Sequence, residues 1–193
     1  MGTAMRLILA SGSPYRLELL REAGYDVTVI PARIDEPPLS TFADLDRGLQ
    51  SIAEQKARAV CDRGVTGLIL AADTVGYAQG EVFGKPRDRN DALRMLRAIS
   101  GTTHEVHTGW CLLRTRDDVM RTGVESTRIT MRDWTPAEFE QYLSGGEWRG
   151  KCGAYGLQLP HDPFVTHLAG SVSNVIGVPL ERLREVLVEL DSL

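Results

Sequence analysis

Cysteine and histidine are scarce in this chain of 193 residues, which contains 3 Cys and 4 His. Cys61, Cys111 and Cys152 are far apart and odd in number. They predict neither a disulfide framework nor a metal-ligand cluster, so a reducing compartment is expected. His104 and His107 fall in an expected strand, where their spacing would point them to opposite faces. The pattern argues against a zinc site.

Long apolar runs and an excess of positive charge are also lacking. No apolar stretch reaches the ~18 residues that a membrane-spanning helix needs, and we expect no signal peptide at the start MGTAMR, which lacks an apolar core. The formal net charge is -4, so no general basic surface recruits nucleic acid or acidic lipid. P-loop and Rossmann phosphate-binding motifs are missing as well. An anionic ligand must therefore be held by local positive groups.

Patterns typical of strands and helices alternate along the chain. Strands are expected at residues 7–10, 25–31, 67–78, 81–83, 103–113, 124–131 and 164–167. Helices are expected at residues 14–23, 44–62, 90–99, 136–143 and 180–190. The two long alternating stretches in the middle predict an antiparallel pair, with polar residues between them. Together these patterns predict an α/β fold with a mixed, twisted sheet and flanking helices.

The length suits one well-buried domain, or two small lobes around one core. The chain has no internal repeat, low-complexity stretch or clear linker. We therefore expect a single domain over residues 5–190, preceded by an N-terminal extension of residues 1–4.

The turn SGSPYR, residues 11–16, joins the first expected strand to the first helix. Ser13 stands at the N-cap position and Pro14 at the first helical position. A helix N-terminus with serine hydroxyls, here Ser11 and Ser13, can hold an anion, and Arg16 can add a bidentate phosphate contact. An ordinary capped helix with a solvated arginine fits the same residues, so both interpretations stay open.

Two carboxylates stand where strands are expected to end or break. Asp73, with Thr74, interrupts the apolar strand at 67–78, and a buried carboxylate there is costly unless it is paired or bound to a metal. Glu36 follows the second strand in a proline-rich loop. Carboxylates from separate segments can hold a hard cation such as Mg²⁺. The alternatives are a turn cap for Asp73 and a solvated surface position for Glu36.

Three lysines lie near these groups in sequence: Lys56 in EQKA, Lys85 in GKP and Lys151 in GKCGAY. Each alone fits a surface lysine. Lys85 stands between glycine and proline, and Lys151 opens a glycine-spaced segment where backbone can approach a ligand. With Arg16 and the two carboxylates, the lysines suggest a cation-assisted polyphosphate site.

Eight motifs occur in order along the chain: LASGSPYRLELL, IDE, AEQKA, AADTV, GKP, SGTTHEVHTG, KCGAYGLQ and SVSNVIGVP. As a set, they resemble the Maf family of nucleoside triphosphate pyrophosphatases, also described as septum-formation inhibitor proteins. The resemblance covers nearly the whole chain, from Arg6 to about Leu190. It implies an elongated α/β fold with two lobes around a deep cleft, related to the inosine triphosphate pyrophosphatases. It also implies a cytoplasmic protein that is often a homodimer.

The activity implied is hydrolysis of a nucleoside triphosphate to the monophosphate and pyrophosphate, with Mg²⁺ or Mn²⁺ as a divalent cation. By resemblance, Asp73 corresponds to the proton acceptor, and it would share the cation with Glu36. The polar residues expected to line the cleft are Ser11, Arg16, Glu36, Lys56 and Lys85. A rival hypothesis is a non-catalytic nucleotide-binding regulator of cell division.

Three positions separate the branches of the family, and here they are Tyr15, Thr74 and Gln158. Thr74 and Gln158 match the dTTP/UTP branch, in which Gln158 would read a pyrimidine edge. Tyr15 matches the aromatic residue of the 7-methyl-GTP branch, which remains an alternative. The stretch GLQLPHDP departs from the usual Gln-Gly-Leu-Gly of the dTTP/UTP branch, so a different turn is expected beside Gln158.

Overall fold

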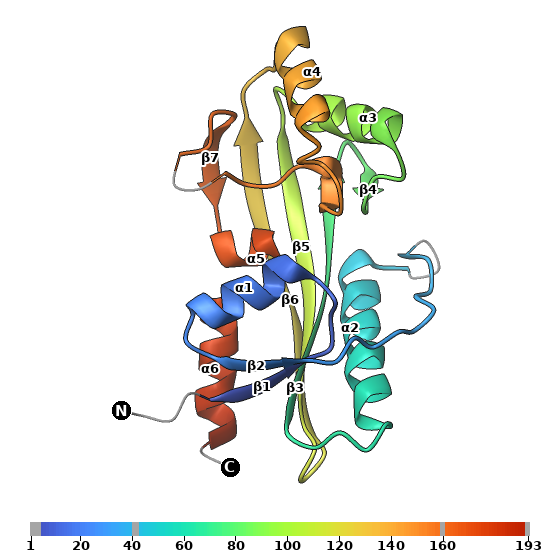
Figure 1. Cartoon of the computed structure of the whole chain (residues 1–193), viewed down its shortest axis with the longest axis vertical. Coiled ribbons are helices and arrows are strands. Elements are labelled where there is room, and N and C mark those ends of the chain that lie inside the picture. Colours follow the sequence, from blue (N-terminus) through green and yellow to red (C-terminus); the bar gives the residue numbers. More distant parts are fainter. Residues whose placement is uncertain (1–4, 40–42, 159–160, 192–193) are drawn as a thin grey trace. The chain divides into compact units, whose positions relative to one another are not determined.

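The computed structural model describes residues 5–39, 43–158 and 161–191, and it falls into two units (Figure 1). Unit 1 takes the described residues of 1–73, 108–125 and 176–193, and Unit 2 takes those of 74–107 and 126–175. The expected N-terminal extension, residues 1–4, lies outside the described residues. That residues 5–190 form a single domain stays a prediction.

The elements of both units follow one another in a mixed order of helices and strands. In chain order they are β1 (Arg6–Leu9), α1 (Pro14–Glu22), β2 (Asp26–Val29), α2 (Leu45–Cys61), β3 (Leu68–Ala78), β4 (Glu81–Phe83), α3 (Arg89–Ile99), β5 (Thr103–Arg114), β6 (Val119–Met131), α4 (Pro136–Gly145), the 3₁₀ turn η2 (Cys152–Ala154), β7 (Val165–Ala169), α5 (Val172–Ile176) and α6 (Leu180–Asp191). Across the described ranges, no helix is both long and apolar enough to cross a membrane.

The strands form one mixed sheet in the order β2-β1-β3-β5-β6-β7, with β4 paired to β3. β1 runs parallel to β2 and β3, whereas β4 is antiparallel to β3 and β7 is antiparallel to β6. Only four residues separate β5 from β6, which is far too few for a parallel crossover and fits the predicted antiparallel pair. The predicted α/β fold with a mixed sheet is confirmed.

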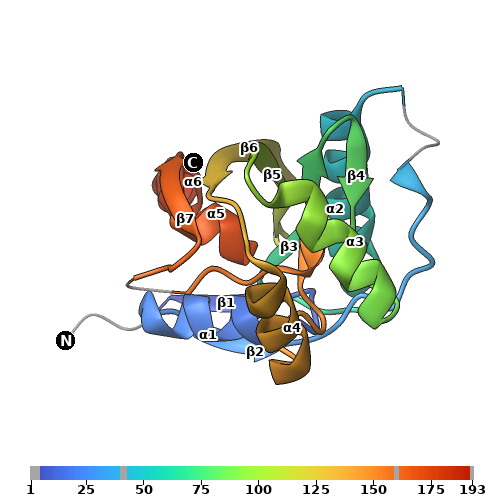
Figure 2. The same cartoon turned by 90° about the horizontal axis from the view of Figure 1, so that it is seen from above.

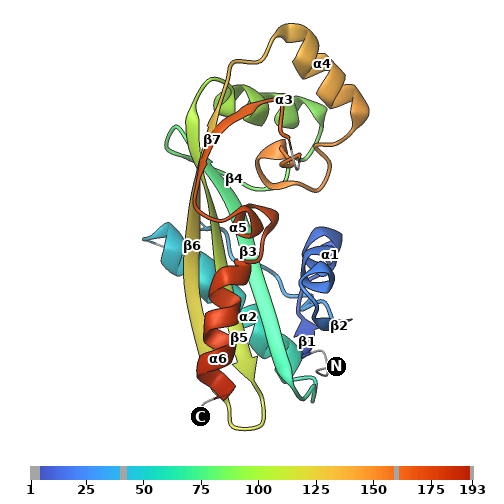
Figure 3. The same cartoon turned by 90° about the vertical axis from the view of Figure 1, so that its left-hand side faces the viewer.

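Unit 1 has helices on both faces of its strands because the strand residues alternate between two apolar faces. Leu7 and Leu9 of β1 pack with α1 and α6, whereas Ile8 packs with α2 on the other face. In Figure 3, α6 lies in front of the strands and α2 behind them. Strands covered on both sides are typical of the parallel part of an α/β fold.

Helix α2 lies against β5 so closely that only glycine fits at position 109. A Cβ on Gly109 would lie 2.4 Å from the carbonyl carbon of Leu49, well inside van der Waals contact. This backbone-to-backbone contact fixes α2 within Unit 1.

Unit 2 has its own apolar core, in which aromatic side chains surround Trp134. The Trp134 and Phe164 rings stack with centroids 3.7 Å apart, and Tyr155 meets Trp134 edge-on at 5.6 Å. Helices α3 and α4 share this core and lie side by side (Figure 2). Burying the large faces of several rings in one cluster supplies much of this unit's hydrophobic stabilisation.

The structure corrects three expectations. Strand β3 runs through Asp73 and Thr74 without a break, because a backbone ladder does not depend on side-chain polarity. Strand β6 begins at Val119, five residues before its predicted start. Its first residues include Arg121 and Thr122, whose polar side chains do not prevent the backbone from forming a strand. The short helix α5 was not expected.

Candidate active site

A buried lysine in Unit 1 brings two acidic side chains together. Lys56 on α2 is 8% exposed, and its Nζ lies 2.9 Å from Glu36 Oε1 and 2.7 Å from Asp73 Oδ1. A buried ammonium is costly unless it is paired, and here it has two carboxylate partners. The three charges sum to one negative charge. We refer to these three residues as the Lys56 cluster.

Local structure explains how the Lys56 cluster forms. The apolar face of α2 carries Ala53 and Ala57 into the core, and Lys56 lies between them in sequence on that same buried face. Arg63 donates to the carbonyl oxygens of Pro31 and Ala32. This contact ties the loop that leads to Glu36 to the end of α2.

The turn at residues 11–16 forms a second polar group in Unit 1. Ser13 is the N-cap of α1, and its side chain accepts from the Arg16 backbone N–H. The Arg16 guanidinium donates to Ser11 Oγ at 2.9 Å and to the Gly177 carbonyl oxygen at 2.9 Å. The capped helix is therefore confirmed. Arg16 is of intermediate exposure, and these two bonds orient its guanidinium.

Strand register brings these two groups to the same end of neighbouring strands. β1 and β3 are parallel, with Leu9 opposite Leu70. Ser11 and Asp73 each follow shortly after that pair, on the carboxyl side of both strands. Ligands of α/β sheets bind at this edge. Asp73 reaches it from within a strand that continues, and not from a strand end as the sequence indicated.

Three further predicted residues of Unit 2 lie around η2, namely Thr74, Lys85 and Lys151. The Cys152 thiol donates to the Thr74 carbonyl oxygen at 2.8 Å, and Gly153 N–H donates to the Gly84 carbonyl oxygen at 3.0 Å. These bonds join the peptide after Asp73 to the loop that carries Lys85. Lys85 is exposed, and its ammonium makes no ion pair with the described residues. Lys151 pairs with Glu147 at 3.2 Å.

The remaining two predicted positions are exposed. Tyr15 is the second residue of α1 and is 41% exposed. Gln158 is also exposed, and its backbone N–H donates to Asp162 Oδ2 at 2.8 Å. Unit 1 therefore contains Ser11, Ser13, Tyr15, Arg16, Glu36, Lys56 and Asp73, and Unit 2 contains Thr74, Lys85, Lys151 and Gln158.

Sequence reasoning missed the residues that hold the predicted ones in place. Gly177 contributes only its carbonyl oxygen, which no sequence pattern reveals. For Cys152, the sequence predicts only that it belongs to no disulfide framework or metal cluster, and it gives no signal for the bond to Thr74. Asp162 did carry a signal, because Asp before Pro is typical of a side chain that caps its own turn.

The donor set suits a hard divalent cation. No group of three or more His, Cys, Asp or Glu side chains converges in the described part of the chain. Glu36 and Asp73 do converge on one point, and each uses a single oxygen on Lys56. Mg²⁺ takes one or two protein carboxylates and completes its shell with water and substrate phosphate. Glu36 and Asp73 therefore fit such an ion.

Comparisons with known proteins identify the family of this chain. The family profile of Maf-like proteins matches residues 6–190. A dTTP/UTP pyrophosphatase of Clostridium perfringens is 35% identical over 97% of this chain and 98% of its own length. Another from Anaeromyxobacter dehalogenans is 44% identical over 95% and 93%.

Among solved structures, the Ham1 protein of Staphylococcus aureus covers 83% of this chain and 79% of its own length. Its TM-score is 0.45 and its sequence identity 12%, too low a similarity to add to the assignment. The sequence matches are sufficient without it: the chain belongs to the family of Maf-like proteins.

Proposed function

We propose that this protein is a nucleoside triphosphate pyrophosphatase that hydrolyses dTTP and UTP to the nucleoside monophosphate and pyrophosphate. The Lys56 cluster carries the proposal, because it holds two carboxylates, each within 2.9 Å of one ammonium. The names of the relatives and the residues Thr74 and Gln158 support the choice of substrate.

In this reaction a water molecule attacks the α-phosphorus, and the bond from that phosphorus to the bridging oxygen breaks. Asp73 Oδ1 stays on Lys56, and Asp73 Oδ2 accepts the proton of the attacking water. The ion pair with Lys56 orients the Asp73 carboxylate for this task. A Mg²⁺ or Mn²⁺ ion held by Glu36 and Asp73 would neutralise charge on the phosphate oxygens.

The other cationic groups act on the triphosphate. Arg16 and Lys85 compensate the charge that develops on the leaving pyrophosphate, together with Lys56. Ser11 and Ser13 supply hydroxyls at the N-terminus of α1, where the helix dipole favours an anion. Lys151 adds a fourth cation beside the backbone of η2.

Base recognition falls to Gln158 and Thr74. A glutamine amide offers both a donor and an acceptor, which matches the carbonyl and N–H of a uracil or thymine edge. A second candidate substrate is 7-methyl-GTP, which is favoured by the exposed ring of Tyr15 because an aromatic face can stack on a cationic base.

A nucleotide panel tests the proposal. The protein is incubated with Mg²⁺ and each of dTTP, UTP, CTP and 7-methyl-GTP, and pyrophosphate release is measured as kcat/KM. We expect dTTP and UTP to be preferred. Preference for 7-methyl-GTP would transfer the assignment to the second candidate. Tight binding of a nucleotide without turnover would instead support a regulator that only binds.

We further propose a reducing, cytoplasmic setting and a homodimer. All three cysteines are free thiols, as expected where disulfides do not form. Light scattering during size-exclusion chromatography measures the assembly, and a monomer at micromolar concentration would contradict it.

A further inference from the structure

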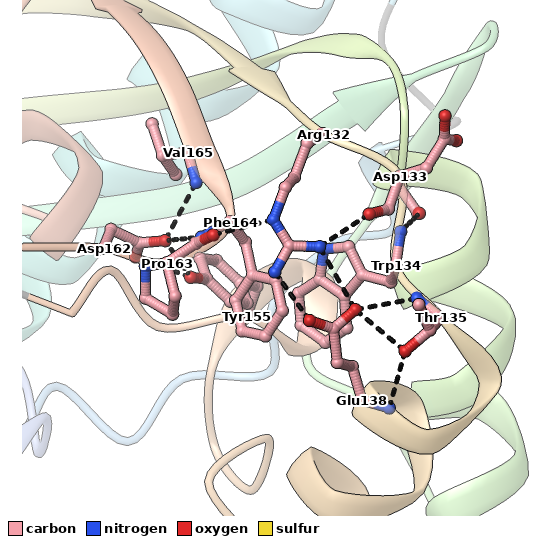
Figure 4. Close-up of polar contacts among 11 residues, drawn as sticks. Arg132, Asp133, Trp134, Thr135, Glu138, Tyr155, Asp162, Pro163, Phe164 and Val165 are labelled. Atoms are coloured by element: carbon pink, nitrogen blue, oxygen red, sulfur yellow. Dashed lines mark hydrogen bonds and ion pairs between the residues drawn. The ribbon is translucent and has the colours of Figure 1, made fainter.

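The carboxylate of Asp162 in Unit 2 accepts hydrogen bonds from four donors, three backbone N–H groups and the Tyr155 hydroxyl. Figure 4 shows Asp162 beside Tyr155, Phe164 and Val165. Oδ1 accepts from the backbone N–H groups of Phe164 at 2.9 Å and Val165 at 3.0 Å. Oδ2 accepts from the backbone N–H of Gln158 at 2.8 Å. The Tyr155 hydroxyl donates to both oxygens, at 2.6 and 2.5 Å. One side chain thus joins the segment at residues 155–158 to the backbone at the start of β7.

The residues that follow Asp162 are part of the Unit 2 core. Phe164, two residues after Asp162, is 8% exposed and stacks on Trp134. The Arg132 guanidinium lies 4.9 Å from the Phe164 ring centroid and donates to the Pro163 carbonyl oxygen at 2.9 Å. Glu138 holds that guanidinium from the other side. The backbone next to Asp162 is therefore held in place independently of the hydrogen bonds that its carboxylate accepts.

Tyr155 is also held in place by its neighbours. The Tyr155 ring stacks on Tyr142 with centroids 5.5 Å apart. The Tyr142 hydroxyl accepts from the backbone N–H of Gly156 at 3.1 Å. Burial and the bond to Asp162 raise the pKa of Tyr155 well above its usual value, so its hydroxyl remains a donor at every physiological pH.

The Gln158 side chain, in contrast, is exposed and forms no hydrogen bond or ion pair with the described part of the chain. Its backbone is fixed at Asp162, while the segment that leads to it is fixed at Thr74 through Cys152. An amide can turn either its donor or its acceptor toward a base edge. Cytosine and uracil differ in which atoms of that edge donate and which accept hydrogen bonds. Selectivity between the two bases therefore needs the amide to be held in a defined place.

We propose that Asp162 is a positioning residue for pyrimidine selectivity, which fixes the backbone of Gln158 so that its amide reads uracil and thymine in preference to cytosine. This inference rests on the proposed function. It also gives Asp162 a role in the stretch GLQLPHDP, where this chain departs from the Gln-Gly-Leu-Gly of the dTTP/UTP branch.

The ratio of kcat/KM for dTTP to that for CTP tests the role. Asp162→Asn replaces one acceptor oxygen by an NH₂ group, which cannot accept from Gln158 N–H. We expect the ratio to fall about tenfold, mainly through a higher KM for dTTP. Tyr155→Phe, which keeps the stacked ring, should lower it about threefold. Tyr155→Phe also serves if Asp162→Asn fails to fold. Asp133→Asn removes an exposed carboxylate nearby and should leave the ratio unchanged.

A double-mutant cycle with Gln158→Ala separates positioning from a structural role. In the Gln158→Ala background, Asp162→Asn should change the ratio less than twofold, because the residue it positions is gone. A merely structural Asp162 would lower activity on both nucleotides alike and leave the ratio unchanged, which overturns the proposal. A wild-type protein that hydrolyses dTTP and CTP equally overturns it too. A wild-type protein that hydrolyses neither contradicts the proposed function itself.

Discussion

The two units hold their functional side chains in different ways. In Unit 1 the side chains hold one another: Lys56 binds Glu36 and Asp73, and Arg16 binds Ser11. In Unit 2 the side chains of Lys85 and Gln158 are exposed, and the backbone beneath them is fixed by bonds at η2 and Asp162. Pairing among side chains therefore dominates the polar groups of Unit 1, whereas in Unit 2 the backbone is fixed and only Lys151, of the predicted site lysines there, has an ion-pair partner among the described residues.

Removing the centre of the Lys56 cluster should have the largest effect. Lys56→Gln leaves two facing carboxylates without their shared cation. We expect turnover to fall at least about 100-fold, because a misplaced base is a poor base. Stability should fall by about 3 kcal/mol, as when one partner of a buried ion pair is lost. Pyrophosphate release and urea unfolding measure the two effects, and wild-type stability would contradict the pairing.

Acid should destabilise the protein through Unit 2, because the buried His104 lies there. Burial lowers the pKa of His104 to about 4, below its ordinary value of about 6.5. The unfolded chain therefore binds this proton first, and stability falls as pH drops below about 6.5. Between pH 7 and 5 the loss from His104 is about 1–2 kcal/mol.

The variant His104→Gln should flatten this part of the stability curve, measured by urea unfolding at each pH. His167→Gln is the matched control, since His167 is exposed, and it should leave the slope unchanged. A slope that persists in His104→Gln would assign the acid sensitivity to another group.

Lys85→Gln sharpens the contrast between the units. Its side chain is exposed and forms no ion pair with the described residues, so stability should stay within about 0.5 kcal/mol. Turnover of dTTP should still fall about tenfold, because the variant loses a charge on the leaving pyrophosphate. Equal losses of stability in Lys85→Gln and Lys56→Gln would remove the distinction between the units.

Tyr15→Arg should have the smallest effect. An arginine at this exposed position adds charge near the N-terminus of α1 and removes a ring that can stack on a base. We expect the preference for dTTP over 7-methyl-GTP to rise about threefold, measured as a ratio of kcat/KM values. An unchanged ratio would make position 15 part of the scaffold and not a selector.

Much of the fold could be predicted because its signals are local. The N-cap at Ser13 and the proline after it define α1, and the apolar face of α2 predicts where that helix packs. The start of β6 and the continuation of β3 could not be predicted, because they depend on the strands beside them. Polarity at Asp73 suggested a break that its pairing with Lys56 makes unnecessary.

The candidate site divides in the same way. The acidic and basic residues could be predicted from their types and from the resemblance to the Maf family. The contacts among them could not be predicted, because Lys56, Glu36 and Asp73 lie in three separate segments of the chain. The bond from Arg16 to the Gly177 carbonyl oxygen is tertiary and has no local sequence signal. Asp162, in contrast, binds residues within seven positions of itself, and its place before proline was a local signal that could have been used.

Hydrolysis of dTTP in water enriched with ¹⁸O tests the central claim most directly, with products analysed by mass spectrometry. Attack on the α-phosphorus places one ¹⁸O in dTMP and none in pyrophosphate, which is the result we predict. Label in pyrophosphate, or release of orthophosphate with dTDP, would contradict the assigned reaction.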